Sequence, residues 1–166
     1  MKIFLLTFLL ASAAYSQIAI GKDNVSSPSV LLEFGNDGNK GIVLPFTNGE
    51  PTNAVPGTFI FDRNLNRVKF KLEGNIWMDL SKESGSSNFS ATALTEMPES
   101  QVILGEDNTE AEGILVLDDS TKAMVLPIVE NYTDIENPSP GMIVFVNTNK
   151  RLAVFNGNKW AFWKSE

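Results

Sequence analysis

Pairs of acidic residues are the first candidates for chemistry in this chain. Glu96 with Glu99, and Glu110 with Glu112, offer the two carboxylates that a glycosidase uses as acid and base. The chain holds 20 acidic residues against 13 basic ones, and in so acidic a composition closely spaced carboxylates are typical of a solvated surface. We therefore interpret both pairs as surface features and predict no catalytic residue.

Two oxygen-rich stretches could bind a hard cation, 36–39 (NDGN) and Asp118-Asp119. Neither has the spacing of the long Ca²⁺ loop with its closing Glu. Asn, Asp and Gly favour tight turns, so we interpret both stretches as turns and predict no metal site. Asp119-Ser120-Thr121 also has the form of a three-residue O-glycosylation acceptor that some bacteria use on exported proteins, and the sequence leaves open whether it is modified.

The chain contains no His and no Cys. Their absence removes the Ser-His-Asp and Cys-His nucleophile systems, the usual proton shuttle at neutral pH and nearly all zinc sites. No disulfide can support the fold either. We expect no enzymatic activity and no bound cofactor.

Aromatic side chains are the remaining candidates for a site. Trp77, Trp160 and Trp163 could form a sugar-stacking face. Trp77 and Trp160 occupy matching places in two similar segments, which favours a structural role in a core or an interface. Trp163 has no such counterpart, and with Phe162 it adds aromatic surface of the kind enriched at interfaces. Phe162 and Trp163 are therefore the predicted binding surface.

Residues 1–16 have the pattern of a secretory signal peptide. Lys2 precedes the apolar run Ile3–Leu10, and Ala14 and Ser16 are small residues at the positions that a signal peptidase reads. The run is too short for a membrane-spanning helix, which needs roughly 20 residues. We expect export to the periplasm, the cell surface or the medium. Without Lys2 the chain has 12 basic and 20 acidic residues, a net charge of −8, which disfavours nucleic acid as a partner.

The strongest internal signal is a repeat. Five short blocks recur in the same order, 82 to 84 residues later. The matching blocks are 20–24 with 104–108, 30–32 with 114–116, 40–45 with 122–127, 56–62 with 140–146, and 74–77 with 157–160. The residues that define the repeat are Pro45, Gly57, Gly74 and Trp77 in the first copy and Pro127, Gly141, Gly157 and Trp160 in the second.

Short apolar runs between turn residues predict an all-β fold of antiparallel strands and hairpins. Residues 41–45 form one such strand, which Pro45 ends, and a polar loop follows to Val55. Residues 68–72 alternate apolar and charged side chains, the pattern of a half-buried strand. We divide the chain into a signal peptide (1–16), a first β unit (17–81), a polar linker (82–101) and a second β unit (102–166).

Units of about 65 residues bury a modest share of their surface and are marginal alone. The terminal hairpin of each unit also leaves an edge that needs a cover. Two solutions are open. The two units can pack on each other as a pseudo-dimer, or matching chains can associate. The linker is long enough for either.

Each unit resembles a repeat of exported bacterial β proteins and of phage tail-fibre-like modules. The shared parts are an Ile-Gly start, a Lys-Gly strand ending in Leu-Pro, a Pro-Gly turn into a strand, and a closing hairpin with Gly and Trp. This chain has them at 20–21, 40–45, 56–62 and 70–77. The second copy has them at 104–105, 122–127, 140–146 and 155–160, with Leu-Gly in place of Ile-Gly and Lys-Ala in place of Lys-Gly. The resemblance implies a structural module without chemistry of its own, often trimeric.

The sequence therefore favours an exported, non-enzymatic structural or adhesive surface protein that forms homo-oligomers, with a trimer favoured. The alternative is a secreted carbohydrate-binding module that uses Phe162 and Trp163 to bind a surface glycan. The identity of any ligand stays open at this stage.

Overall fold

A computed structural model describes residues 17–35, 38–86, 101–105, 109, 111 and 113–163. The predicted signal peptide, residues 87–100 of the predicted linker and the pairs Glu96–Glu99 and Glu110–Glu112 lie outside these residues. The predicted all-β fold is confirmed, because the described residues form short strands and the 3-10 turn η2 (Tyr132–Asp134). Among them, no helix has the length and apolar character needed to cross a membrane.

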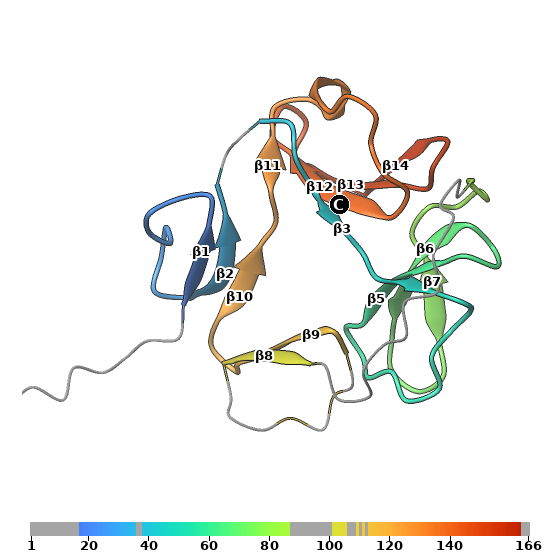
Figure 1. Cartoon of the computed structure of the whole chain (residues 1–166), viewed down its shortest axis with the longest axis horizontal. Helices are drawn as coiled ribbons and strands as arrows, with labels where there is room; N and C mark the ends of the chain where they lie inside the picture. The colour runs from blue at the N-terminus through green and yellow to red at the C-terminus, as the bar shows by residue number, and fades with distance from the viewer. Residues whose placement is uncertain are drawn as a thin grey trace, which may run out of the picture.

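The first half of the chain forms seven strands among the described residues (Figure 1). They are β1 (Ile18–Ile20), β2 (Val30–Phe34), β3 (Ile42–Val43), β4 (Phe46–Thr47), β5 (Phe59–Asp62), β6 (Arg67–Lys71) and β7 (Trp77–Asp79). The strands described in the second half are β8 (Val102–Gly105), β9 (Leu115–Asp118), β10 (Ala123–Val125), β11 (Ile128–Val129), β12 (Met142–Val146), β13 (Arg151–Phe155) and β14 (Trp160–Trp163).

Two four-strand paths form the largest layers, in the order β4-β5-β6-β7 and β11-β12-β13-β14. Their registers coincide. Phe59 pairs with Phe70, and Ile143 pairs with Val154, each position 84 residues later. The Phe61 N–H donates to the Pro45 carbonyl at 2.8 Å, and the Phe145 N–H donates to the Pro127 carbonyl at 2.9 Å. The two prolines thus place β4 beside β5 and β11 beside β12.

The predicted polar loop after Pro45 is wrong at its start. Phe46 and Thr47 form β4, a parallel neighbour of β5. Pro cannot donate a backbone hydrogen bond, but its carbonyl can accept one. Pro45 therefore does not end the extended segment, and the next two residues pair with β5 as β4. The sequence pattern gave no sign of a two-residue strand.

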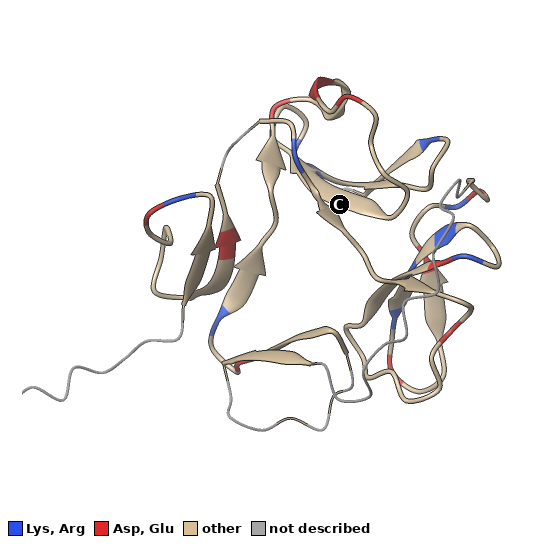
Figure 2. Ribbon diagram, viewed as in Figure 1, with Lys and Arg blue, Asp and Glu red and all other residues tan. Residues whose placement is uncertain are grey.

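Two smaller sheets complete the fold. β1, β2 and β10 form one sheet, and β8 with β9 forms the other. Both β1–β2 and β8–β9 are parallel, but their registers differ by one residue under the 84-residue offset, because Ile18 pairs with Leu32 whereas Val102 pairs with Leu115. Figure 1 shows these sheets on the left and at the bottom, around the same centre as the two larger layers. Charged residues lie largely on the outer loops, including the turn around η2 at the top (Figure 2).

Candidate functional site

The two halves of the chain are joined by exchanged strands. β3, from the first half, lies antiparallel on the edge of β12, with Val43 opposite Met142 and Ile42 opposite Ile143. The Leu44 N–H donates to the Gly141 carbonyl at 3.0 Å. This pairing continues the β11-β12-β13-β14 layer with a strand from the other half.

The approach at this contact is close enough to require glycine. A Cβ built on Gly41 would lie 2.6 Å from Cγ1 of Val144 and 3.0 Å from the Ile143 carbonyl oxygen. Contacts of that length do not occur between real side chains, so any larger residue would push β3 away from β12. The predicted Lys-Gly start of this strand thus has a packing reason in the first copy.

The second half gives a strand in return. β10 lies parallel to β2, and the Ala123 N–H donates to the Ser29 carbonyl at 2.9 Å. Val30, Leu31 and Leu32 of β2 are buried. One half therefore supplies β3 to the other half's sheet and receives β10 on its own.

An apolar cluster lies between the halves. Its buried members are Phe61, Val68 and Leu80 from the first half and Ile143 and Val154 from the second. Half-buried side chains surround them, including Ile42, Leu44, Phe46, Phe59, Phe70, Met78, Leu126, Leu152, Ala161 and Trp163. Because the cluster draws on both halves, separating them would expose much of the core. The sequence left open whether the two units pack on each other or whether matching chains associate. The structure shows the first arrangement, packing of the two halves within one chain.

The segment after β7 is docked on the closing hairpin of the second half. Asn156 is buried, donates from Nδ2 to the Glu83 carbonyl at 2.9 Å, and accepts at Oδ1 from the Lys159 N–H at 2.8 Å. A Cβ on Gly85 would lie 1.6 Å from the Asn156 carbonyl oxygen, and one on Gly157 would lie 1.7 Å from that of Ser86. Residues 82–86 of the predicted linker are therefore held on β13–β14.

The repeat residues lie at turns and close approaches. Gly57, Gly74, Gly141 and Gly157 all have positive φ, a conformation that glycine adopts without a steric penalty. Gly57 and Gly141 precede β5 and β12, and Gly74 and Gly157 lie in the closing hairpins. Each pair thus performs the same backbone task in both halves.

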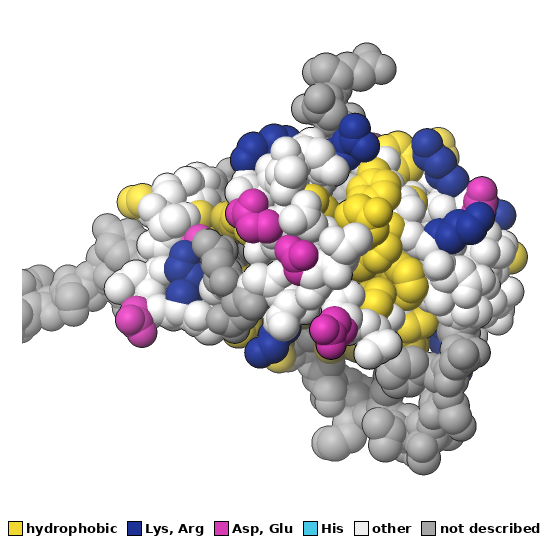
Figure 3. All heavy atoms as spheres, turned by 90° about the horizontal axis from the view of Figure 1, so that it is seen from above, with side chains coloured by type: hydrophobic (Ala, Val, Ile, Leu, Met, Phe, Trp, Pro, Cys, Tyr) yellow, Lys and Arg dark blue, Asp and Glu magenta, His cyan; other side chains and the backbone are white. Residues whose placement is uncertain are grey.

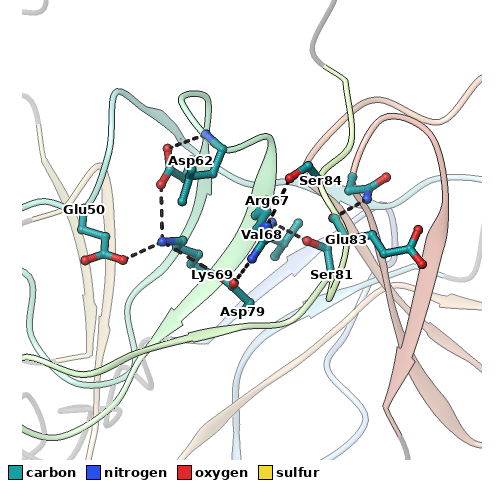
Figure 4. A network of polar contacts seen from close by, with 11 residues as sticks. Glu50, Asp62, Arg67, Val68, Lys69, Asp79, Ser81, Glu83 and Ser84 are labelled. Carbon is teal, nitrogen blue, oxygen red and sulfur yellow. Dashed lines mark hydrogen bonds and ion pairs between the residues drawn. The ribbon is translucent and has the colours of Figure 1, made fainter.

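A polar network with Lys69 and Asp62 buried at its centre occupies one face of the first-half sheet (Figure 4). Lys69 Nζ lies 2.6 Å from Glu50, 3.5 Å from Asp62 and 3.9 Å from Asp79. Arg67 also pairs with Asp79. Burial lowers the pKa of Lys69, but the Glu50 hydrogen bond and the nearby carboxylates outweigh it, and the net pKa is raised. The ammonium therefore stays charged inside this face.

The network corrects the expected half-buried pattern of residues 68–72. Val68 is buried as expected, but Lys69 and Lys71 are buried too. The matching positions of the second half are apolar: Val146 stands for Asp62, Ala153 for Lys69 and Phe155 for Lys71, and the first two lie in a cluster with Val129, Ile135, Met142 and Val144. One scaffold thus carries a charged face in one half and an apolar face in the other.

The predicted binding surface, Phe162 and Trp163, is half-buried on β14. Trp163 donates its indole N–H to the Leu80 carbonyl at 2.7 Å, and Lys82 Nζ lies 5.4 Å from its ring centre. Phe162 makes an edge contact with Tyr132 at 5.1 Å. Both rings thus contact other parts of the same chain, and the role assigned to them stays a prediction.

A small hollow of about 160 Å³ lies beside these rings, lined by Ser81, Lys82, Glu83, Lys159, Trp160, Ala161 and Phe162. Lys159 and Glu83 form an exposed ion pair at its rim, 2.7 Å apart. Seen from above, the side of the molecule where η2 lies carries a continuous apolar band between charged side chains (Figure 3).

The two predicted structural tryptophans have different surroundings. Trp160 packs against the apolar cluster of the second half and lies 5.2 Å from Phe155 and 6.0 Å from Tyr132, measured between ring centres. Trp77 carries Lys71 Nζ over its ring at 5.3 Å. The apolar face around Trp160 and the charged face around Trp77 follow the difference between the two halves.

The turn at Asp119-Ser120-Thr121 is held by its own side chains. Asp119 Oδ1 accepts from the Thr121 N–H and from Thr121 Oγ1, both at 2.8 Å, and its other oxygen lies 2.9 Å from Lys122 Nζ. The Lys122 hydrogen bond, followed by those from Thr121, lowers the pKa of Asp119 far below its usual range. This is the turn chemistry expected for the stretch, and Ser120 and Thr121 are exposed.

Comparison with known proteins adds one match. Residues 103–165 match the family model described as "Phage tail like trimerisation region". No match to the chain was found among curated proteins, and none among solved structures. The matched residues run from β8 through β14, and the predicted resemblance to phage tail-fibre-like modules is confirmed.

Proposed function

We propose that this chain is an exported, non-enzymatic structural or adhesive protein that self-associates, as a trimer, into a tail-fibre-like module. The match of residues 103–165 to a phage tail like trimerisation region carries this proposal. Strand exchange between the halves supports it, since a module that already completes its sheets with strands from another unit needs no new kind of contact to add a further chain.

Native mass spectrometry of the chain from Gln17 to Glu166 tests self-association. Ions of three chains support the proposal, and ions of a single chain at every concentration contradict it. Export is tested separately, by expressing the full chain and determining the N-terminus of the product. A product that begins at Gln17 supports export, and an uncleaved product contradicts it.

A second candidate is a carbohydrate-binding module that uses Phe162 and Trp163. The hollow beside Phe162, with Lys159 and Glu83 at its rim, favours it. A glycan array separates the two functions. A specific signal that disappears in Trp163→Ala supports sugar binding. Leu65→Ala, on an exposed turn of the first half, is the matched control and should leave any signal unchanged.

A further inference from the structure

Within one chain the two halves form one interface, in which each half adds a strand to a sheet of the other. Each half also has the strand edge at which a second interface of the same kind would form. The first half receives β10 on β2, and the second half receives β3 on β12. The edges at the matching repeat positions are that of β9 in the second half and that of residues 58–59 in the first half, on the side of β5 where β4 pairs further along the strand. Among the described residues, no strand from the other half lies on either of these edges.

The edge of β5 is an accurate counterpart of the occupied edge of β12. Both strands have the same pairs on either side, and Gly57 and Gly141 make the same bond, to the Lys71 and Phe155 carbonyls at 3.0 and 2.8 Å. The Gly141 carbonyl accepts from Leu44. The Gly57 carbonyl is the equivalent acceptor on β5.

The space beside these two glycines differs. A Cβ built on Gly141 would lie 3.0 Å from Phe61 Cβ and 3.1 Å from Phe46 Cε1, both from the other half. A Cβ built on Gly57 meets no atom of the described residues within 4 Å. The first-half edge thus lacks the neighbour that the second-half edge has.

The edge of β9 shows the same difference in burial. Val30 and Leu31, on the covered strand β2, are 5 % and 1 % exposed. Their counterparts 84 residues later, Ile114 and Leu115, are 57 % and 49 % exposed. An exposed apolar strand edge is a template for pairing with another strand. The counterpart edge on β2 is covered by β10, so the strand expected on β9 is β3, which occupies the repeat position of β10.

The strands that would cover these edges are β3 and β10. Among the described residues, each is paired with another strand along one edge only. In a strand, successive backbone groups face opposite sides. Leu44 faces β12, so Gly41 and Val43 face away from it. Ala123 faces β2, so Met124 and Leu126 face away from β2. Each of β3 and β10 can therefore pair on both sides at once.

We propose that the second half of one copy binds the first half of a second copy through the same strand pairs that join the halves within one chain. β10 lies on the second copy's β5, and the second copy's β3 lies on β9. This proposal rests on the proposed self-association and names its surface and its partner, a second copy of the chain.

The register on β5 follows from the internal pairing. Val43 opposite Met142 becomes Val125 opposite the second copy's Thr58, and the Leu126 N–H donates to the second copy's Gly57 carbonyl. Gly41 fits against Met142 and Val144 only because it has no Cβ. In the second pairing Ala123 takes its place, Thr58 replaces Met142 and Ile60 replaces Val144, so β10 lies slightly farther from the second copy's β5 than β3 lies from β12.

Cysteine crosslinking tests the pairing, because the chain has no Cys of its own. Val43 and Met142 form a non-hydrogen-bonded antiparallel pair, whose short Cα separation suits a disulfide. The proposed Val125–Thr58 pair has the same non-hydrogen-bonded register. Single variants Val125→Cys and Thr58→Cys are mixed and oxidised, so that only a bond between two copies can form between them.

We expect a covalent dimer from the mixture and little from either variant alone. The control for register is Val125→Cys mixed with Leu65→Cys, an exposed residue of the β5–β6 turn, which should give no dimer. The control for the internal interface is the double variant Val43→Cys and Met142→Cys, which should close within one chain. Failure of that closure would overturn the proposal, because the internal interface is its basis.

Two results would overturn the proposal and leave self-association intact. One is an oligomer by mass in which Val125→Cys and Thr58→Cys do not crosslink. The other is a dimer from Val125→Cys mixed with Met142→Cys, since that result pairs like halves of different chains. A wild-type chain that is monomeric by mass would overturn the proposed self-association as well.

A second variant tests β9. Ile114→Lys places a charge on an exposed residue, so folding should be retained, with an unchanged circular dichroism spectrum. We expect its association to weaken markedly relative to Ile76→Lys, the same change at a similarly exposed residue of the β6–β7 hairpin, outside both edges. Equal association of these two variants would overturn the β9 contact.

Discussion

Leu44 donates its backbone N–H to the carbonyl of Gly141, 3.0 Å away, and so joins β3 of the first half to β12 of the second. This bond marks the start of an interface in which the two halves complete each other's sheets. The interface depends on the missing side chain of Gly41, whose Cβ would lie 2.6 Å from Val144.

Gly41→Ala should therefore destabilise the chain. The added methyl group overpacks the contact between β3 and β12, at a cost of about 1–3 kcal/mol. Chemical denaturation measures the change. Gly113→Ala is the matched control, because a Cβ there makes only ordinary contacts, the nearest at 3.5 Å from Val116, and we expect a change within about 0.5 kcal/mol. Equal stability of the two variants would show that β3 does not lie so close to β12.

The buried network around Lys69 should respond to paired replacement. Lys69→Ala leaves the buried carboxylate of Asp62 without its ammonium, whereas Asp79 keeps Arg67 and Glu50 is exposed to solvent. We therefore expect a loss of about 3 kcal/mol, the low end of the range for breaking a buried ion pair. The double variant Asp62→Val and Lys69→Ala copies the second half, which has Val146 and Ala153 there. Its loss should be smaller than the sum of the single losses. Additive losses in a double-mutant cycle would contradict coupling between the two groups.

Glu33 should make stability depend on pH. It is buried on β2, and its pKa is lowered first by the hydrogen bond from Lys22 and then by that from the Ser26 N–H, each at 2.6 Å. A lowered folded-state pKa gives stability that is present above the ordinary Glu pKa, about 4.3, and is lost as pH falls through the folded-state value. Glu33→Gln should lose less stability than wild type over that acid range. Identical slopes in thermal unfolding from pH 5 downward would contradict this assignment.

Trp160→Ala and Trp77→Ala should differ. Trp160 packs on an apolar cluster, so its removal should cost about 3–5 kcal/mol. The ammonium of the buried Lys71 over the half-buried Trp77 ring contributes about 1–2 kcal/mol, and we expect a smaller loss there. Equilibrium unfolding of both variants measures the two values. A change below about 1 kcal/mol in both would place the rings on the surface and favour sugar stacking.

The sequence predicted the features that turn residues and apolar runs encode locally. The Pro-Gly turns before β5 and β12 and the closing hairpins lie where the pattern placed them, because glycines with positive φ and short β-rich runs leave few alternatives. The two-residue strands β4 and β11 were missed, since each is defined by its parallel neighbour and by the carbonyl of Pro45 or Pro127.

The contacts between the halves could not be read from the sequence. Nothing local distinguishes Gly41, which packs on Val144, from a glycine that only turns the chain. The burial of Lys69 and Lys71 was equally hidden, because alternation alone does not say which face of a strand is covered. One signal was available: Val146 and Ala153 stand at the repeat positions of Asp62 and Lys69, and a charged pair replacing an apolar pair in one repeat indicates a buried network.

The proposed function depends on the association of this chain with two further copies of itself. Light scattering on the chain from Gln17 to Glu166, over a concentration series, tests it most directly. We expect the mass of three chains, with dissociation only on dilution. A sharp peak with the mass of one chain that persists at high micromolar concentration would contradict it.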